Sequence, residues 1–538
     1  MTLDADAVVI GSGLGGLSAA LGLAQAGQRV LLLERHEVPG GYSQSFHVDG
    51  FRFSPGVHYV GELHEGGLVR RLFEGLGAAP DFFELNRERV DSCVLGEERF
   101  EHCAGREALT ARFAARFPSE ARGVAAVLET IASLHARLTS SVETHRARDF
   151  QRWSERDRFF ALAPLDTLLK QWVRDPLCRA FLTVHCTNYG LPPSLAPLAV
   201  HATNQGHYLE GGFHPRGGGA GLVKSLLAPL RQRGGQVLLE TGVARVLVER
   251  GRAVGVRLAD GRELRSKVVV SNADPLVTWT KLVGLEHAPP AVRARLERVR
   301  WSMPAVSLFL VVDADVRALG LDSGNLWITG SDQEGLHRAA NDERPWGDAS
   351  PAFFLSVSTL KDPTHFDGRH HVLEVTAAIG WHVFARWAAD PEGRHAPGYL
   401  ALKQQLEARL LEAVERAVPG LTARVVAKTL ATPLTSERYV GVTRGAQYGV
   451  EKSRDLFGPH AFPVSGELEG LALCGASTLG HGVLGAVLSG VAAASSVLEV
   501  PLSGVLTARD AKVRTWPAED ASCWPGELQA AVSRRSRD

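Results

Sequence analysis

The chain has 538 residues, of which 45% are hydrophobic, and its 59 Lys and Arg residues balance 59 Asp and Glu residues. This length allows two or three structural units around a large core, and the balanced charge without a long basic run excludes an electrostatic footprint for nucleic acid. The cysteines form no CxxC pair, which indicates neither a zinc site nor a disulfide scaffold; they are Cys93, Cys103, Cys178, Cys186, Cys474 and Cys523. Because no basic and apolar signal segment precedes the first expected strand, we expect a cytoplasmic protein.

The first predicted unit is a strand, a glycine turn and a helix close to the N-terminus. Residues 7–10 form an apolar run typical of a buried parallel strand, and Gly11-x-Gly13-x-x-Gly16 follows directly. Gly11 allows a tight turn, the missing side chain of Gly13 lets a pyrophosphate approach the backbone, and Gly16 lets the next helix pack closely on the sheet.

A second strand, predicted over residues 30–33, ends at Glu34. A carboxylate at this place can accept hydrogen bonds from both hydroxyls of an adenosine ribose and would repel a ribose phosphate. The strand, three glycines, helix, second strand and terminal Glu occur at the spacing of a dinucleotide site. A purely structural turn between the two strands is the alternative.

The next stretch, ERHEVPGGYSQSF, bears on which dinucleotide is bound. It places Arg35 after the Glu and the pair Gly40-Gly41 shortly afterwards. This resembles the extended fingerprint of the flavoprotein superfamily that includes amine oxidases and phytoene desaturases. There the basic residue and the glycine pair line the path from the ribose to the flavin. An NAD-binding half-domain with a Gly-Gly loop is the alternative.

Residues 64–230 have a mostly helical pattern, with one long apolar face over residues 124–138. Aromatic residues follow along this block, and they either line an apolar substrate tunnel or belong to the core: Trp153, Phe159, Phe160, Trp172, Phe181 and Tyr189. A glycine-rich loop and a helix are expected over residues 211–227.

A run of strands is predicted from residue 235, with Asp260-Gly261 as a hairpin turn, and residues 300–425 mix strands with one helix. The strand patterns in this mixed block are AVSLFLVVD, AFFLSVSTL and HVLEVTAAI, and the helical pattern is LKQQLEARLLEAVERAV. Four histidines fall close together here, but their spacing matches no zinc pattern, so we predict no metal site; they are His365, His370, His371 and His382.

Near the C-terminus, an apolar strand precedes a small-residue helix over residues 482–498. This uncharged segment is nearly long enough to cross a bilayer, but Gly, Ala and Ser dominate it, which favours a buried helix packed against backbone or ligand. The free N–H groups at its start favour negative charge, including that on the N1–O2 edge of a reduced flavin. The polar tail after residue 500 is expected to be peripheral.

Several motifs in one order resemble the phytoene desaturase, carotenoid isomerase and retinol saturase family over most of residues 5–500. They are the N-terminal fingerprint, GFRFSPGVHYVG, GGFHPRGGGAGLVKSL, ETGVARVLVERGRAVGVRLADGR with VVVSNADP, TPLTSERYVGVTRGAQYG and GLALCGASTLGHGVLGAVLSGVAAA. The resemblance implies an α/β fold, in which a Rossmann-type FAD-binding domain is assembled from distant segments around an inserted mixed α+β substrate domain and a helical lid region. The expected units are residues 1–75, 231–280 and 426–500 for FAD, 76–230 for a helical substrate or membrane-contacting region, 281–425 for substrate, and 501–538 for the tail.

The resemblance also implies non-covalent FAD and a set of contacts to it. These are Gly11, Gly13, Leu14, Gly15, Gly16, Glu34, Arg35, Gly40, Gly41, Tyr42, Ser43, Gly56, Val57, His58, Val243, Ala273, Gly475, Ala476, Ser477, Val483, Leu484 and Ala486. No catalytic residue is assigned, although His58, Tyr59 and His481 are candidates for a proton donor or a contact with substrate. A covalent flavin link at Cys474 is the alternative to a small buried thiol.

The implied activity is hydride transfer between the flavin and the carbon–carbon double bonds of a lipophilic isoprenoid or polyene, as in a desaturase, a saturase or a cis-trans isomerase. The direction stays open, because Ser54 stands where many relatives have an acidic residue and Ala476 stands where isomerases and saturases often have a longer polar one. An FAD amine oxidase and a non-catalytic flavin-binding subunit are the alternatives. For so apolar a substrate we expect peripheral membrane contact through an apolar helical patch within residues 100–225.

Overall fold

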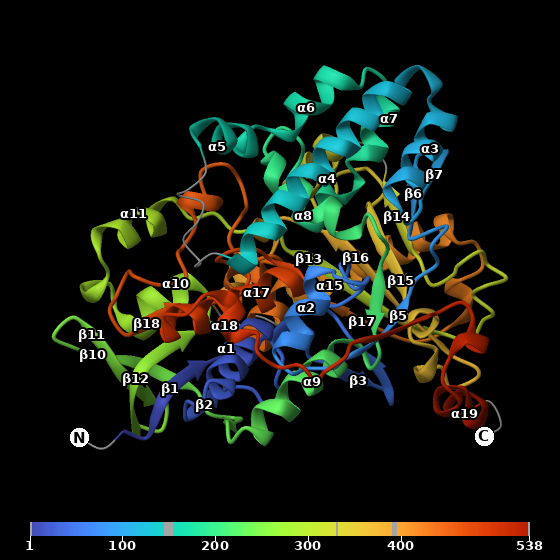
Figure 1. Ribbon diagram of the computed structural model, residues 1–538. Helices are drawn as coiled ribbons and strands as arrows, with labels where there is room; N and C mark the ends of the chain where they lie inside the picture. Colours follow the sequence, from blue (N-terminus) through green and yellow to red (C-terminus); the bar gives the residue numbers. More distant parts are fainter. Residues whose placement is uncertain (1–2, 145–153, 330–331, 390–394, 536–538) are drawn as a thin grey trace.

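The computed structural model describes residues 3–144, 154–329, 332–389 and 395–535 (Figure 1). Its first seven-stranded sheet has the order β10-β11-β12-β1-β2-β9, and β18 also pairs with β12. The strands are β1 (Ala5–Ile10), β2 (Val30–Leu33), β9 (Gln236–Leu238), β10 (Val243–Glu249), β11 (Arg252–Leu258), β12 (Glu263–Ser271) and β18 (Leu471–Leu473). β1 pairs in parallel with β2 and β12, and β12 pairs in parallel with β18, so segments more than 200 residues apart build one sheet. The Rossmann-type domain assembled from distant segments is confirmed.

Two helices that follow glycine motifs pack against each other beside this sheet. They are α1 (Leu14–Gln25) and α17 (Gly482–Leu498), and α9 (Gly218–Gln232) also contacts α1. A β-carbon at Gly490 of α17 would overlap the carbonyl oxygen of Gly15, so glycine is what allows this close approach. Within the described residues, no helix is both long and apolar enough to cross a membrane.

The second seven-stranded sheet has the order β17-β13-β16-β15-β14-β6-β7. Its strands are β6 (Asp91–Leu95), β7 (Glu98–His102), β13 (Ala305–Val312), β14 (Asn325–Thr329), β15 (Phe353–Val357), β16 (His371–Ala378) and β17 (Val425–Ala431). The three strands predicted within residues 300–425 are confirmed. The helical expectation is wrong for residues 91–102, where a hairpin turns at Gly96, whose φ is +62°, and β6 joins β14 in parallel.

Two small sheets and several further helices lie outside these two large sheets; the small sheets are β19-β5-β8 and β3-β4. The strands are β3 (Phe46–Val48), β4 (Phe51–Phe53), β5 (Asp81–Glu84), β8 (Phe213–Pro215) and β19 (Arg514–Pro517). The helices are α10 (Pro275–Val277), α11 (Pro290–Arg298), α12 (Gln333–Ala340), α13 (Ser358–Lys361), α14 (Ala385–Ala388), α15 (Pro397–Ala417), α16 (Pro433–Tyr439), α18 (Leu502–Val505) and α19 (Gly526–Arg535). The β11–β12 hairpin turns at Gly261, whose φ is +90°, as the Asp260-Gly261 pair predicts.

A helical block occupies the upper part of Figure 1. It contains α3 (Arg106–Arg116), α4 (Ala121–Thr144), α5 (Glu155–Leu162), α6 (Leu165–Trp172), α7 (Pro176–Leu182) and α8 (Leu198–Tyr208). The shorter α2 (Leu68–Gly75) lies near the centre of the view and contacts α17. Phe181 and Tyr189 belong to its core. Phe159, Phe160 and Trp172 are instead 76%, 45% and 40% exposed, so both expectations for them, core or tunnel, are wrong; Trp153 lies outside the described residues.

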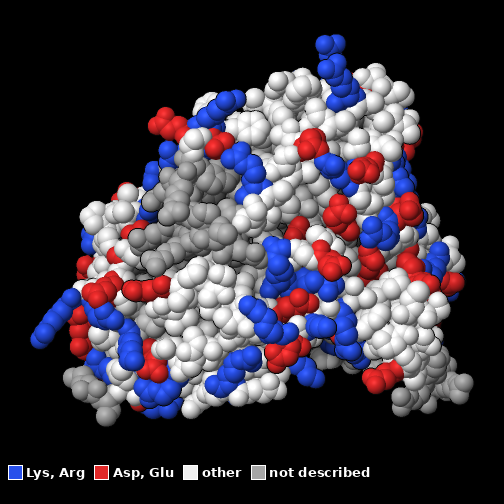
Figure 2. Space-filling model, in the orientation of Figure 1, with Lys and Arg blue, Asp and Glu red and all other residues white. Residues whose placement is uncertain are grey.

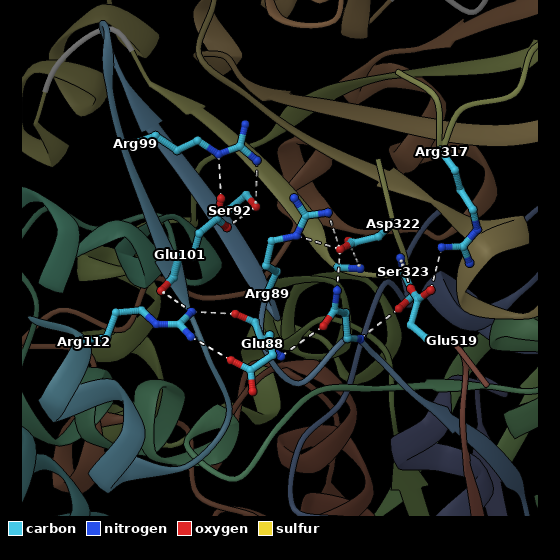
Figure 3. A network of polar contacts seen from close by, with 12 residues as sticks. Glu88, Arg89, Ser92, Arg99, Glu101, Arg112, Arg317, Asp322, Ser323 and Glu519 are labelled. Atoms are coloured by element: carbon cyan, nitrogen blue, oxygen red, sulfur yellow. Dashed lines mark hydrogen bonds and ion pairs between the residues drawn. The ribbon is translucent and has the colours of Figure 1, made fainter. Parts of the chain in front are cut away.

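The C-terminal segment is more integrated than the polar tail predicts. β19 pairs in parallel with β5, and Trp524 and Leu528 are buried beside it. Glu519 accepts hydrogen bonds from the backbone N–H of Ser323 at 2.8 Å and from Arg317 at 2.6 Å, within the polar network of Figure 3. The described part of this segment therefore closes the edge of a small sheet, which corrects the expectation of a peripheral tail.

Candidate cofactor site and central cavity

The turn between β1 and α1 has the geometry that its glycines predict. Gly11 has a φ of +89°, and a β-carbon at Gly16 would overlap the carbonyl oxygen of Gly11. α1 begins after Gly13 without a side-chain cap and without an acidic residue in its first turn. The N–H groups at this helix start are therefore available to an anion such as a pyrophosphate.

Glu34 also holds this turn in place. Its carboxylate accepts hydrogen bonds from the Ser12 backbone N–H at 2.9 Å, from Ser12 Oγ at 2.6 Å and from the His36 N–H at 2.9 Å. Ser12 Oγ in turn accepts from the N–H of Gly40 at 3.0 Å. The predicted ribose residue thus also links the fingerprint loop to the Gly40-Gly41 loop.

Asn272, which is not among the contacts predicted from the sequence, joins the N-terminal and C-terminal glycine motifs. A β-carbon at Gly13 would lie 2.7 Å from its Nδ2, and one at Gly475 would lie 2.8 Å from its Oδ1. A β-carbon at Gly15 would lie 2.8 Å from the backbone nitrogen of Gly475. Asn272 directly precedes the predicted contact Ala273 and is the first residue after β12. Its place at the end of a parallel strand is the signal that could have identified it.

Other predicted contacts surround the same turn. Arg35 donates to the carbonyls of Glu437 and Arg438 at the end of α16, at 3.4 and 3.2 Å. Val243 begins β10 two residues after Thr241, whose N–H donates to the Glu34 carbonyl at 2.8 Å. These contacts bring residues of all three expected FAD segments next to Glu34.

The Gly40-Gly41 loop contacts two further predicted segments. A β-carbon at Gly41 would lie 3.4 Å from the Cα of Gly13, and Ser43 is buried against the start of α9. Tyr42 donates through its hydroxyl to the Ala446 carbonyl at 3.0 Å, and its own carbonyl leaves no room for a β-carbon at Gly56.

The C-terminal motif forms a second helix start at the site. Gly475 donates its N–H to Ser489 Oγ at 2.7 Å, and Ser477 Oγ accepts from the Val450 N–H at 3.1 Å. Like α1, α17 begins without a side-chain cap and without an acidic residue in its first turn. Leu14 opens α1, and Val483, Leu484 and Ala486 lie in the first turns of α17.

A central cavity of about 600 Å³ adjoins these motifs. Its wall comes from residues 56–60, from α4 and α8, from residues 448–467 and from residues 478–488. Five of the predicted flavin contacts line it: Gly56, Val57, His58, Val483 and Leu484. The cavity therefore lies where a substrate would reach a flavin held by both motifs.

The segment that carries His58 is clamped by side chains from the second sheet. Glu374 of β16 accepts from the Ser54 N–H at 3.0 Å, and its other oxygen lies 3.0 Å from His58 Nδ1. Lys361 donates to the His58 carbonyl at 3.0 Å, and His214 Nδ1 lies 2.9 Å from the same oxygen. Burial lowers the pKa of Lys361 to about 7.

Glu374 and Lys361 were not identified from the sequence. The available signal was one charged residue inside the apolar pattern HVLEVTAAI and another directly after the apolar pattern AFFLSVSTL. A charged side chain that folding buries needs a partner. Here the partners include the Ser54 N–H and the His58 imidazole for Glu374, and the His58 carbonyl and the Asn325 side chain for Lys361.

Three other candidate residues, Tyr59, His481 and Cys474, are buried or partly buried among neighbouring side chains. Tyr59 stacks on Tyr208 with ring centroids 4.2 Å apart, and burial raises its pKa well above the usual range. Burial lowers the pKa of His481 to about 3, which keeps its imidazole neutral at physiological pH. Cys474 is buried with a raised pKa, and its Sγ lies 3.5 Å from Asn272 Oδ1.

The four histidines of residues 365–382 do not converge on one point. His365 pairs with Asp362 at 2.6 Å and His370 with Asp367 at 2.8 Å. His371 bonds to Thr359 inside the sheet, whereas His382 bonds to the Asp342 carbonyl. Within the described ranges, no group of three or more His, Cys, Asp or Glu side chains has the arrangement of a metal site.

Together these features fit FAD. The two uncapped helix starts would hold an anionic pyrophosphate and a flavin edge, glycines remove the β-carbons that would block close approach, and Glu34 ends the strand where an adenosine ribose would be held. The individual contact residues stay predictions.

Comparisons with known proteins agree with this geometry. Residues 14–498 match the family described as flavin containing amine oxidoreductase. The all-trans-retinol 13,14-reductase of Rattus norvegicus is 28% identical over 95% of this chain and 88% of its own, and the chloroplastic prolycopene isomerase of Arabidopsis thaliana is 28% identical over 93% and 86%. The crystal structure of an oxidoreductase from Methanosarcina mazei superposes with a TM-score of 0.64 at 17% identity, covering 92% of this chain and 99% of that one. The chain belongs to the flavin containing amine oxidoreductase family and is an FAD-dependent oxidoreductase.

Proposed function

We propose that this protein uses FAD to act on carbon–carbon double bonds of a lipophilic isoprenoid or polyene. The observation that carries the proposal is the central cavity, which lies against both flavin motifs. Relatives that align over nearly the whole chain are named for retinol and prolycopene, both of which are isoprenoid polyenes.

The protein's own residues would bind the polyene, orient it and exclude water. Part of the cavity wall is apolar and comes from Val57, Val60, Leu484 and Leu488. A polyene can bind against such a wall by apolar contact alone, without an ionisable partner. Bound FAD would supply an acceptor and donor of two electrons. Glu374 and Lys361 would keep the His58 segment in place beside it.

An amine oxidase is the second candidate, because the family is named for amines. A protonated amine is best held by a free carboxylate. Among the described residues that line the cavity, the only acid is Glu467, and it pairs with Arg295 at 2.5 Å. The cavity's other cation, Lys452, would repel an ammonium group, so the polyene is favoured.

We further propose that α5 and α6 rest on a membrane surface, from which a lipophilic substrate enters. Phe159, Phe160 and Trp172 expose large apolar rings, and Leu195 nearby is 47% exposed. α5 contacts α8, and residues of α8 line the cavity together with residues at the end of α4. Charges of both signs intermingle on the face in Figure 2, so we expect binding to depend little on salt or anionic lipid.

Two experiments test these proposals. Anaerobic incubation of the FAD-loaded protein with primary amines and with polyenes, followed by the flavin absorbance, separates the two activities. A response to amines alone would overturn the polyene proposal, and no response of the flavin to any compound or reductant would favour the non-catalytic subunit.

Flotation with uncharged liposomes at low and high salt tests the membrane contact. The double variant Phe159→Ser/Trp172→Ser should lose flotation, whereas the same change at Leu400, an exposed apolar residue on α15, should not. Equal flotation of both variants would contradict the assignment to α5 and α6. The cytoplasmic location stays a prediction.

A further inference from the structure

The central cavity contains a lysine that neither the flavin motifs nor the clamp around His58 explains. Lys452 is only 2% exposed and lines the cavity. Its ammonium group donates to the Ala476 carbonyl at 2.7 Å and to the Val450 carbonyl at 3.0 Å. An ammonium group carries three N–H donors, so one remains beyond these two bonds.

The charge of Lys452 also lacks a counterion. No carboxylate among the described residues pairs with it, and burial lowers its pKa to about 7. The other cation of the wall, Arg295, is neutralised by Glu467. A pure hydrocarbon in this cavity would leave the ammonium group desolvated and unpaired, which is unfavourable.

We propose that Lys452 binds an oxygen atom at one end of the substrate, so that the site selects polyenes that end in a carboxylate or hydroxyl over hydrocarbon polyenes. This inference rests on the proposed function and narrows its substrate class. The Ala476 carbonyl places the ammonium group beside the second flavin motif, so an oxygenated end held there fixes which double bonds lie against the flavin. Lys452 is thus a specificity-determining residue.

Binding of three probes to the FAD-loaded protein tests the inference. The probes are a C20 polyene carboxylic acid, the corresponding alcohol and the corresponding hydrocarbon, with dissociation constants measured from fluorescence quenching in detergent micelles at pH 6.5. The wild type should bind the acid about 10- to 100-fold more tightly than the hydrocarbon, which corresponds to one charge-assisted hydrogen bond of about 1.5–3 kcal/mol.

The variant Lys452→Met keeps the length and apolar stem of the side chain and removes the charge. It should lose the preference for the acid and keep its affinity for the hydrocarbon. Lys403→Met, the same substitution at a half-buried lysine of α15, is the matched control and should keep the preference. If Lys452→Met fails to fold, the ratio of acid to hydrocarbon affinity in the wild type still decides the question.

Two results would overturn the inference. One is equal affinity of the wild type for acid and hydrocarbon. The other is an unchanged ratio in Lys452→Met; a shifted flavin midpoint potential in the same variant would then assign the ammonium group to the flavin instead. Failure of all three probes to bind would contradict the proposed function itself, whereas tight hydrocarbon binding without acid preference would contradict only the role of Lys452.

Discussion

Replacing Glu34 by Ala tests whether the end of β2 holds the adenosine ribose. The structure shows three donors on this carboxylate, namely the Ser12 N–H, the Ser12 hydroxyl and the His36 N–H. A carboxylate offers about four acceptor positions, so it can retain part of this support and still receive ribose hydroxyls. The variant should therefore weaken both the loop and the cofactor complex.

The magnitude follows from the two ribose hydroxyls. Hydrogen bonds to a charged acceptor contribute about 1.5–3 kcal/mol each, so the lower bound for two is about 3 kcal/mol. The dissociation constant of FAD should rise by about 100-fold or more in Glu34→Ala. The free energy of unfolding of the apoprotein should fall by about 1–3 kcal/mol, because the buried Ser12 donors lose their acceptor.

Titration of apoprotein with FAD, followed by quenching of flavin fluorescence, measures the first effect, and urea denaturation of the apoprotein measures the second. Glu37→Ala is the matched control, because Glu37 is an exposed carboxylate three residues along the same loop. The reasoning is refuted if Glu34→Ala destabilises the apoprotein but binds FAD as tightly as the control. That outcome would mean that the carboxylate only supports the loop.

Three further predictions concern the same site. Gly490→Val should lower the free energy of unfolding by about 1–3 kcal/mol or more, since its side chain would collide with the backbone of α1, whereas Gly526→Ala, with open space around it, should change little in a thermal scan. Lys361→Met removes the donor to the His58 carbonyl, and the visible circular dichroism of bound flavin should change; an unchanged spectrum would mean that the clamp does not reach the cofactor. Acid precipitation should release yellow FAD into the supernatant, because the buried Cys474 thiol has a raised pKa and stays protonated; flavin retained in the pellet would contradict this.

Local patterns predicted the cofactor domain well, because two backbone segments that approach closely require glycine at the point of contact. Gly11, Gly13, Gly16 and Gly490 occupy positions where a β-carbon would collide with backbone or with Asn272, or where φ is positive. Strand patterns bounded by turn residues likewise predicted β13, β15 and β16. Such constraints act over a few residues, so one sequence suffices to detect them.

Contacts between residues far apart in the sequence could not be predicted from local patterns. The carboxylate of Glu374 reaches Ser54 across 320 residues, and β19 pairs with β5 from the far end of the chain. The hairpin of β6 and β7 was missed because it sits within a helical block, where only Gly96 marks the turn. The exposed rings of Phe159 and Trp172 could not be told from core aromatics. The short α5 gives little periodicity, and in α6 Trp172 follows the buried Leu168 and Leu169 at the spacing of a core residue.

The most direct test of the central claim is the product mass after a single anaerobic turnover. FAD-loaded protein, with the flavin either oxidised or chemically reduced beforehand, is mixed with one equivalent of a C20 polyene alcohol, and flavin absorbance and product mass are recorded together. We expect a polyene product that has lost two hydrogens as the oxidised flavin bleaches, gained two as the reduced flavin recovers its colour, or changed only its double-bond geometry. Unchanged polyene in both flavin states, together with bleaching by a primary amine and release of its aldehyde, would contradict it.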